Sequence, residues 1–277
     1  KIARVTADLS KAQKAATISW TVEPTTTISV VDAVVSKDAA DWTLDEQKAA
    51  ADDIAKNGEA SKVYAKAKAA MDAGTTWSVK LTNGKTMTYR IIGIDHDDLA
   101  DGSGKAGLTF LTTSTTISSR MNATSTNAGG WEASELRQKM NSGEIWNLMP
   151  ADLQSKVKAV TKLTNNVGGD DANKNAAVTA TTDRLFLLSY SEIVETPYSG
   201  WSSWSWIGSE GTQYEAFKGK VTNNYSGNSA IAIGSSWWER SAYPRDSAIF
   251  LSVYPSGDPS YINSATYSIC ICPAFSF

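Results

Sequence analysis

Residues 235–277 read SSWWERSAYPRDSAIFLSVYPSGDPSYINSATYSICICPAFSF, and two compositions are interleaved in this stretch. One set needs burial or a fixed backbone, and its apolar members recur at about every second position within short runs, as half-buried strands require. It consists of Trp237, Trp238, Arg240, Phe250, Val253, Gly257, Ala265, Ile269, Ile271, Pro273, Ala274 and Phe275. The other set, of Ser, Tyr, Asn, Asp and Pro, clusters in the turns between those runs. A rigid frame with Tyr-rich and Ser-rich turns is typical of a recognition surface, so we expect binding without catalysis.

The overall composition excludes several classes of partner. The chain of 277 residues has a net charge of only -3 and a pI of about 5.3, so no basic field favours nucleic acid. No apolar run approaches the roughly 18 residues that a spanning helix needs, so no membrane insertion is expected. The two cysteines, Cys270 and Cys272, are two apart, which in a strand holds their Cα atoms near the limit for bridging. The sequence therefore predicts no disulfide framework.

Residues 1–75 are predicted to form an N-terminal segment of strands followed by a helical hairpin. Strand-like runs occupy residues 17–22 and 27–35, separated by Glu23 and Pro24. This part of the chain could be a hairpin or part of an appended module.

The two helices of this segment are predicted from their end signals. Thr43 is an N-cap with Glu46 three residues later, which is the pattern of a capping box, and this helix runs to residue 56. The second helix covers residues 61–72 and ends before Gly74.

The pattern changes to period two after residue 75, where we place a domain boundary. Apolar residues alternate with polar ones at 77–81, and a return strand follows at 87–94. Asn83 and Gly84 lie between the two runs and are a strong hairpin signal. The second domain is therefore expected to cover residues 76–277.

Short elements are predicted through the rest of this domain. We expect a strand at 108–111, a helix at 132–141, a helix starting at 149–152 with apolar residues as far as Val160, a mobile loop at 165–182 and a buried strand at 185–188. Short strands with a few helices and long irregular connections indicate an α+β fold rather than alternating strands and helices of a parallel sheet.

Four motifs in this order carry a family resemblance. They are GGWEASELR at residues 129–137, DRLFLLS at 183–189, WWERS at 237–241 and PAF at 273–275. With these motifs the domain resembles the C-type lectin fold, and specifically the variable proteins of diversity-generating retroelements of phages and gut bacteria. It is more distantly similar to formylglycine-generating (sulfatase-modifying) enzymes.

The resemblance implies a fixed scaffold with a hypervariable ligand-binding surface. In such proteins a reverse transcriptase mutates adenines in a C-terminal repeat, here residues 235–277, so that exposed positions vary while the scaffold is retained. It implies a protein or glycan ligand and display on a cell surface or phage virion. The positions expected to contact the ligand are Ser235, Tyr243, Pro244, Arg245, Asp246, Ser247, Tyr254, Ser256, Asp258, Ser260, Tyr261, Ile262 and Asn263.

A second contact surface is expected in the Trp/Ser-rich loop at residues 198–206. Tryptophans in such a loop either pack against the frame or anchor a ligand. We include Trp201 and Trp204 among the candidate ligand-binding residues.

Metal and cofactor sites find little support. The single histidine, His96, lies in the acidic stretch at 95–101, but the third position counted from Asp97 is Leu99 and the twelfth is Leu108, which departs from the calcium-loop spacing. One histidine and two closely spaced cysteines do not make a zinc site. We expect no metal and no cofactor.

Two other functions remain open at this point. A constitutive carbohydrate-binding lectin or adhesin would share the scaffold without a retroelement. The similar oxidases use a cysteine pair with bound copper, whereas Cys270 and Cys272 lie in what reads as the last core strand and are expected to pack as small apolar side chains. The oligomeric state also remains open.

Overall fold

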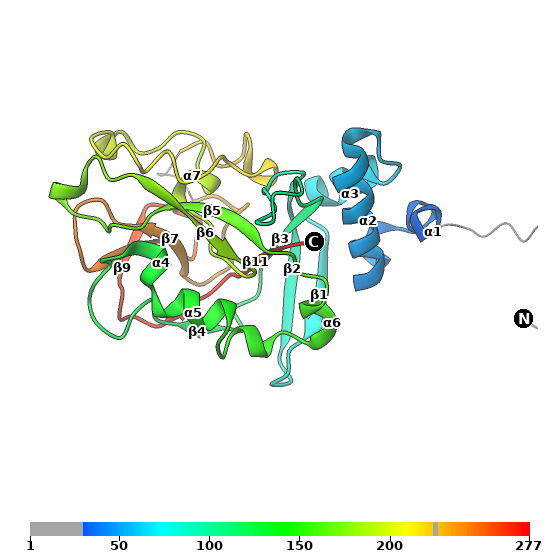
Figure 1. Ribbon diagram of the computed structural model, residues 1–277, viewed down its shortest axis with the longest axis horizontal. Coiled ribbons are helices and arrows are strands. Elements are labelled where there is room, and N and C mark those ends of the chain that lie inside the picture. The colour runs from blue at the N-terminus through cyan, green and yellow to red at the C-terminus, as the bar shows by residue number, and fades with distance from the viewer. Residues whose placement is uncertain (1–29, 224–226) are drawn as a thin grey trace, which may run out of the picture.

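The computed structural model describes residues 30–223 and 227–277, and in this part the protein is α+β (Figure 1). The helices are α1 (Val30–Ser36), α2 (Leu44–Asn57), α3 (Tyr64–Ala73), α4 (Gly130–Ala133), α5 (Glu135–Asn141), α6 (Ala151–Gln154) and α7 (Tyr190–Ile193). Short 3-10 turns are η2 (Ala39–Asp41), η3 (Gly58–Ala60), η4 (Trp146–Leu148), η5 (Asp171–Asn173), η6 (Ser199–Trp201) and η7 (Glu215–Phe217). The strands are β1 (Thr76–Lys80), β2 (Thr86–Ile94), β3 (Leu108–Thr112), β4 (Ser118–Ser119), β5 (Val160–Asn165), β6 (Val178–Asp183), β7 (Trp237–Ala242), β8 (Ile249–Val253), β9 (Tyr261–Ser264), β10 (Ile269–Cys270) and β11 (Ala274–Ser276). No helix in the described part combines the length and apolarity needed to cross a bilayer.

The strands of the described residues form three sheets, in the orders β1-β2-β3-β11, β4-β10-β7-β8-β9 and β5-β6. All pairings are antiparallel except the short one between β10 and β7. The last strand, β11, pairs with β3 and places Phe275 opposite Phe110. The C-terminal residues are thereby built into the sheet that the first strands begin.

The predicted strand at 27–35 is wrong where the structure describes it, because Val30–Ser36 is the helix α1. Val34 is fully buried, and Val31 and Val35 pack against the same core. The spacing of these three valines (i, i+3, i+4) is helical, and this packing outweighs the weak strand preference of valine. The other predicted strand, at 17–22, lies outside the described residues.

The helical hairpin is confirmed. Thr43 caps α2, and its side chain and that of Glu46 form the reciprocal bonds of a capping box. α3 ends at Gly74, which adopts the left-handed conformation with φ 67°. The start of α2 and the end of α3 therefore follow from local sequence, whereas α3 starts at Tyr64, three residues later than predicted.

The hairpin of helices and the first sheet share one core across residue 75. The rings of Trp42 and Trp77 stack with centroids 6.4 Å apart, and the Tyr89 hydroxyl donates to Gln47 at 3.1 Å. Gly107 allows the α2 backbone to approach, because a Cβ atom there would lie 1.9 Å from the Ala51 carbonyl oxygen. In Figure 1 α2 and α3 lie beside β1–β3, at the opposite end from β9.

Two predicted helices differ from the structure in extent: the helix at 132–141 is confirmed except at Ser134, and the helix that starts at 149–152 is shorter than predicted. The helix at 132–141 is divided into α4 and α5 at Ser134, whose extended backbone (ψ 140°) lets its side chain cap α5. The helix that begins after Pro150 ends at Gln154, and Val160 instead starts β5.

The predicted loop at 165–182 is wrong at both ends, because Asn165 ends β5 and residues 178–182 belong to β6, which pairs with β5 over six residues. No strand forms at residues 166–177. Cross-strand pairing of this kind depends on a distant partner and is not visible in a local Thr/Ala-rich pattern. The apolar run at 185–188 is fully buried as expected, but it forms only one bridge, from Phe186 to Ala274.

Replacing Gly107 with Ala should destabilise the fold by about 3 kcal/mol, since the new methyl group meets backbone rather than a side chain that can rotate away. Chemical denaturation measures this change. Gly208→Ala is the matched control, with its nearest neighbour Pro197 at 3.5 Å, and should change stability by less than about 0.5 kcal/mol. Equal stability of the two variants would contradict the close approach of α2.

Candidate functional site

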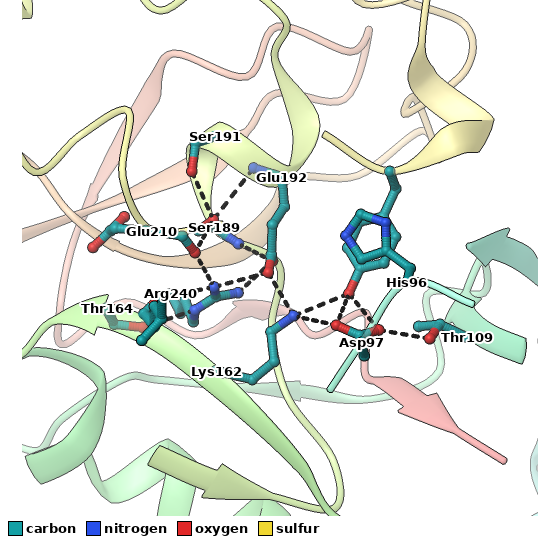
Figure 2. Close-up of polar contacts among 12 residues, drawn as sticks. His96, Asp97, Thr109, Lys162, Thr164, Ser189, Ser191, Glu192, Glu210 and Arg240 are labelled. Atoms are coloured by element: carbon teal, nitrogen blue, oxygen red, sulfur yellow. Dashed lines mark hydrogen bonds and ion pairs between the residues drawn. The ribbon is translucent and has the colours of Figure 1, made fainter. Parts of the chain in front are cut away.

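Four charged residues from separate segments of the chain form a buried polar network (Figure 2): Asp97, Lys162, Glu192 and Arg240. The Arg240 guanidinium pairs with both oxygens of Glu192. It also donates to the backbone carbonyls of Leu163, Leu187 and Glu210 and to the Thr164 hydroxyl. Arg240 thus joins β7 to β5, to the run before α7 and to the segment at Glu210.

Lys162 occupies the middle of the polar network. Its ammonium group lies 2.7 Å from Asp97 and 2.5 Å from Glu192 and donates to the Tyr214 hydroxyl at 3.1 Å. It also lies 4.5 Å from the centre of the Phe186 ring. These contacts use all three N–H donors of the lysine.

The charges of the polar network are balanced by their pairing. Burial alone would raise the pKa of Asp97 and of Glu192, but Lys162 lowers that of Asp97, and Arg240 with Lys162 lowers that of Glu192, so both lie below their ordinary values. Both acids are therefore held as carboxylates.

The charged groups of the polar network already have partners within the protein, which limits the chemistry that they can perform. A recess of about 390 Å³ opens beside Asp97, Lys162 and Glu192. However, each of these groups already has a charged partner, and the donors of Lys162 and Arg240 are all engaged with described residues. The polar network therefore acts as a clamp between elements rather than as a supply of free nucleophile or base.

Two further buried acids lie next to this clamp. Glu210 is fully buried, and burial raises its pKa to about 7 even though it accepts bonds from Asn165 N and Ser241 Oγ. Glu239 on β7 is fully buried, and neither of its carboxyl oxygens has a hydrogen-bond partner in the described part of the chain. Burial, followed by the charges of Glu210 and Asp258, raises the pKa of Glu239 well above its ordinary value. Glu239 is thus held as a neutral acid at neutral pH.

The β8–β9 hairpin (residues 249–264) presents the exposed aromatic side chains among the predicted ligand-binding positions. Tyr254, Tyr261 and Ile262 are about 40% exposed, at 43%, 40% and 38%, and the rings of the two tyrosines lie 4.7 Å apart. Ser256 is exposed, and Asp258 caps Ser260 in the connecting turn. β9 is the outer strand of its sheet, so this group of side chains faces outward.

The turn between β7 and β8 (residues 243–248) is packed more tightly. Asn127 is fully buried. Its side-chain amide donates to the carbonyls of Asp246 and Ile249, and its backbone N–H donates to Ser247 O. Gly169 lies so close that a Cβ there would be 1.8 Å from the Tyr243 carbonyl oxygen.

This packing corrects the expectation for one residue of the turn. Pro244 is buried and does not reach the surface. Tyr243 is half-buried with its ring 5.9 Å from that of Trp201, whereas Arg245 and Ser247 are exposed and Asp246 is intermediate.

The predicted positions form two clusters rather than one. Tyr243 to Ser247 lie at one end of β8, while Tyr254, Ser256, Asp258, Ser260 and Tyr261 lie at the other. β8 has five residues, so the ends are roughly 16 Å apart. Ile262 and Asn263 on β9 lie between them, and half-buried Ser235 precedes β7.

Trp201 and Trp204 are buried, which corrects the expectation of a second contact surface. Their exposed fractions are 4% and 5%. Trp201 packs edge-on against Tyr190 and Tyr198, and the Trp204 indole donates to Asp170 O at 3.1 Å. Of the two roles open to such tryptophans, the structure selects packing against the frame.

The residues considered for metal or thiol chemistry are separated. His96 stacks on Tyr214 at 4.0 Å and bonds Glu215. Burial would raise the pKa of Glu215, but the bond to His96 outweighs it and lowers that pKa to about 2. Residues 30–223 and 227–277 contain no group of three or more His, Cys, Asp or Glu placed to hold a metal ion. Cys270 and Cys272 are both free thiols, the second fully buried.

Sequence reasoning identified Arg240 as part of the frame but missed its partners. Arg240 donates to three backbone carbonyls, and its charged partner is Glu192. Lys162 was not predicted as a site residue, because the helix predicted to start at 149–152 has its apolar residues as far as Val160. The available signal was the alternation V-T-K-L-T-N, which places Lys162 on the buried face of β5.

Replacing Glu239 with Gln should change how stability depends on pH. The folded protein keeps a proton on Glu239 that the unfolded chain releases above its ordinary pKa of 4.5, so wild-type stability falls as pH rises beyond that value. The variant lacks this loss, and its stability relative to wild type should rise by about 1.4 kcal/mol per pH unit from about pH 5 upward.

Urea denaturation across this pH range measures the difference. Exposed Glu195 supplies the control variant Glu195→Gln, since its side chain is solvated in both states. A constant difference between Glu239→Gln and wild type from about pH 5 to about pH 8 would contradict a neutral buried Glu239.

A match to a known protein family covers the part of the chain that contains most of the polar network and the β8–β9 hairpin. Residues 106–277 match a family model described as a domain of unknown function, DUF6273. No curated protein and no solved structure matches the chain. The matched region covers more than half of the sequence and includes Lys162, Glu192, Arg240 and the whole β8–β9 hairpin. The chain therefore belongs to the DUF6273 family.

Proposed function

We propose that this protein is a ligand-binding display protein with a C-type lectin fold, and that the β8–β9 hairpin is its contact surface. The ligand is a surface protein or glycan, and affinity comes from burial of exposed tyrosines with hydrogen bonds from neighbouring polar residues, without catalysis. The observation that carries the proposal is the adjacent pair Tyr254 and Tyr261, both exposed on an outer hairpin. Aromatic side chains exposed together are enriched where proteins bind partners.

The frame beneath the hairpin supports this proposal. Every residue of β7 is buried, and the Trp237 and Trp238 indoles donate to Ile231 O and Ser119 O. Arg240 ties the same strand to three other segments. A surface supported in this way can change its exposed residues while the backbone is retained, which diversification by a retroelement would require.

The architecture supports the C-type lectin fold as the form of this frame. Short antiparallel strands alternate with long irregular connections, such as residues 120–129 between β4 and α4. The motif at 237–241 coincides with β7, and the motif at 273–275 with the start of β11. Display on a cell surface or virion is part of the proposal because it rests on the same resemblance.

The hairpin should tolerate substitution much better than the frame. Tyr254→Asn, Tyr261→Ser and Ile262→Asn should each change the free energy of unfolding by less than about 1 kcal/mol, because the side chains are already partly hydrated. Phe250→Ala, at a fully buried position of β8, should cost about 3–5 kcal/mol. Chemical denaturation compares the four variants. A loss of unfolding free energy at Tyr254 and Tyr261 as large as that at Phe250 would contradict the division between frame and surface.

The double variant Tyr254→Ala/Tyr261→Ala should keep the fold and lose ligand binding. We would first screen the wild-type protein against an immobilised glycan array and a panel of bacterial surface proteins, then measure the variant on each hit by surface plasmon resonance. Affinity should fall by at least about 100-fold, the effect of removing two aromatic anchors of an interface. Tyr267→Ala is the matched control, because Tyr267 is 59% exposed but lies beyond β9.

The outcome separates the proposal from its alternatives. Wild-type affinity in the double variant would show that the hairpin is not the contact surface. Glycan binding that disappears on chelation of calcium would favour a constitutive lectin. A near-copy of the codons for residues 235–277 that differs only at adenines, beside a reverse transcriptase gene, would support diversification.

A further inference from the structure

A second cavity, of about 210 Å³, lies between the first sheet and the segment that precedes β7. β1, β2 and β3 contribute Thr76, Arg90, Leu111 and Thr112 to its wall, and residues 229–233 form the opposite side. Trp237 also lines it. The cavity is separate from the β8–β9 hairpin, so a ligand bound here is independent of the proposed function.

Arg90 is the only charged residue in the lining of this cavity. Its guanidinium donates one hydrogen bond, from Nη2 to Ala230 O, and lies 5.8 Å from the Phe217 ring centre. It forms no ion pair with a carboxylate of residues 30–223 and 227–277, and its Nε is buried without a hydrogen-bond partner there. Burial lowers the pKa of Arg90, with no opposing charge to raise it.

The surroundings of Arg90 differ from those of Arg240 in the lack of a carboxylate partner among the described residues. Arg240 is fully buried, and all three of its nitrogens bond to acceptors that include a carboxylate. Taking a guanidinium out of water without such a partner is costly. Arg90 is half-buried, so a negative charge brought into the cavity would find a cation that is partly desolvated and unpaired.

The rest of the lining selects the kind of anion. Thr112 is fully buried, and its hydroxyl has no hydrogen-bond partner in the described part of the chain. Native proteins leave few such groups, and a bound ligand or ion is one of the usual reasons. The other walls are mostly apolar, from Leu111, Ile231, Ile233 and Trp237. Such a mixture suits a ligand with one charged end and a short hydrocarbon body.

We propose that this cavity binds a small monocarboxylate with a short apolar chain, whose carboxylate pairs with Arg90. The planar guanidinium donates from two adjacent nitrogens to the two oxygens of the carboxylate, a geometry that a single-point cation cannot reproduce. The chain of the ligand lies along Leu111, Ile231 and Ile233.

The test uses sodium butyrate as the probe and butyramide as a neutral molecule of the same shape, with sodium chloride to match ionic strength. Binding to the full chain is followed by calorimetry and by the Nε–H NMR resonance of Arg90. Butyrate should shift this resonance and saturate at millimolar concentrations, whereas butyramide should not. Equal binding of the two probes, or tighter binding of inorganic phosphate, would overturn the assignment.

Two variants locate the site. Arg90→Met should weaken butyrate binding at least tenfold, while Arg120→Met should leave it unchanged, because Arg120 pairs with Glu135 and does not line the cavity. Ala232→Phe keeps Arg90 but fills the cavity, and it should also abolish binding even if Arg90→Met fails to fold. Its matched control is Ala180→Phe on the exposed face of β6. Butyrate affinity within twofold of wild type in Ala232→Phe would overturn the proposal.

Discussion

The ion pair between Arg240 and Glu192 is the interaction on which the C-terminal half of the molecule depends. Both groups are removed from water, and a buried charge that loses its partner typically costs about 3–5 kcal/mol. Arg240 also satisfies carbonyls from three separate segments, and Lys162 extends the pairing to Asp97. Since these segments have no regular pairing with one another at these carbonyls, the guanidinium supplies the donors that a continuous sheet would otherwise provide.

The same strand carries an acid that no group in the described residues satisfies. Glu239 is adjacent to Arg240 in sequence, but alternation along β7 sends their side chains to different surroundings. The charge of Arg240 is neutralised by an ion pair, whereas Glu239 is neutral because it keeps its proton. Strand β7 at the base of the hairpin therefore carries a paired Arg240 and a neutral Glu239 at adjacent positions. Of these two, only Glu239 makes stability depend on pH above the ordinary pKa of a carboxyl group.

The exposed hairpin and the buried frame differ in what holds them. β8 is covered on both faces except at its first residue, while β9 has solvent on one edge and carries Tyr261 and Ile262 outward. The two turns differ for a related reason. Asn127 and Gly169 hold the β7–β8 turn against the body of the protein, whereas the β8–β9 turn contacts Asn228 through Gly257 and leaves Tyr254 and Ser256 exposed. The surface available to a partner is accordingly smaller than the full set of polar turn residues.

The amino-acid sequence by itself determined the elements whose signals are local: the capping box at Thr43, the Asn83-Gly84 hairpin, the alternation in β1 and β2, and the interleaving of apolar and polar residues after Ser235. These depend on hydrogen bonds and backbone preferences within a few residues. Only the tertiary structure decided that Lys162 meets Asp97, that Glu192 meets Arg240, that Trp201 and Trp204 are core, and that Arg90 faces a cavity. Each of these outcomes depends on which distant segment arrives as a neighbour, because burial and charge pairing are properties of the assembled fold and are absent from the local pattern.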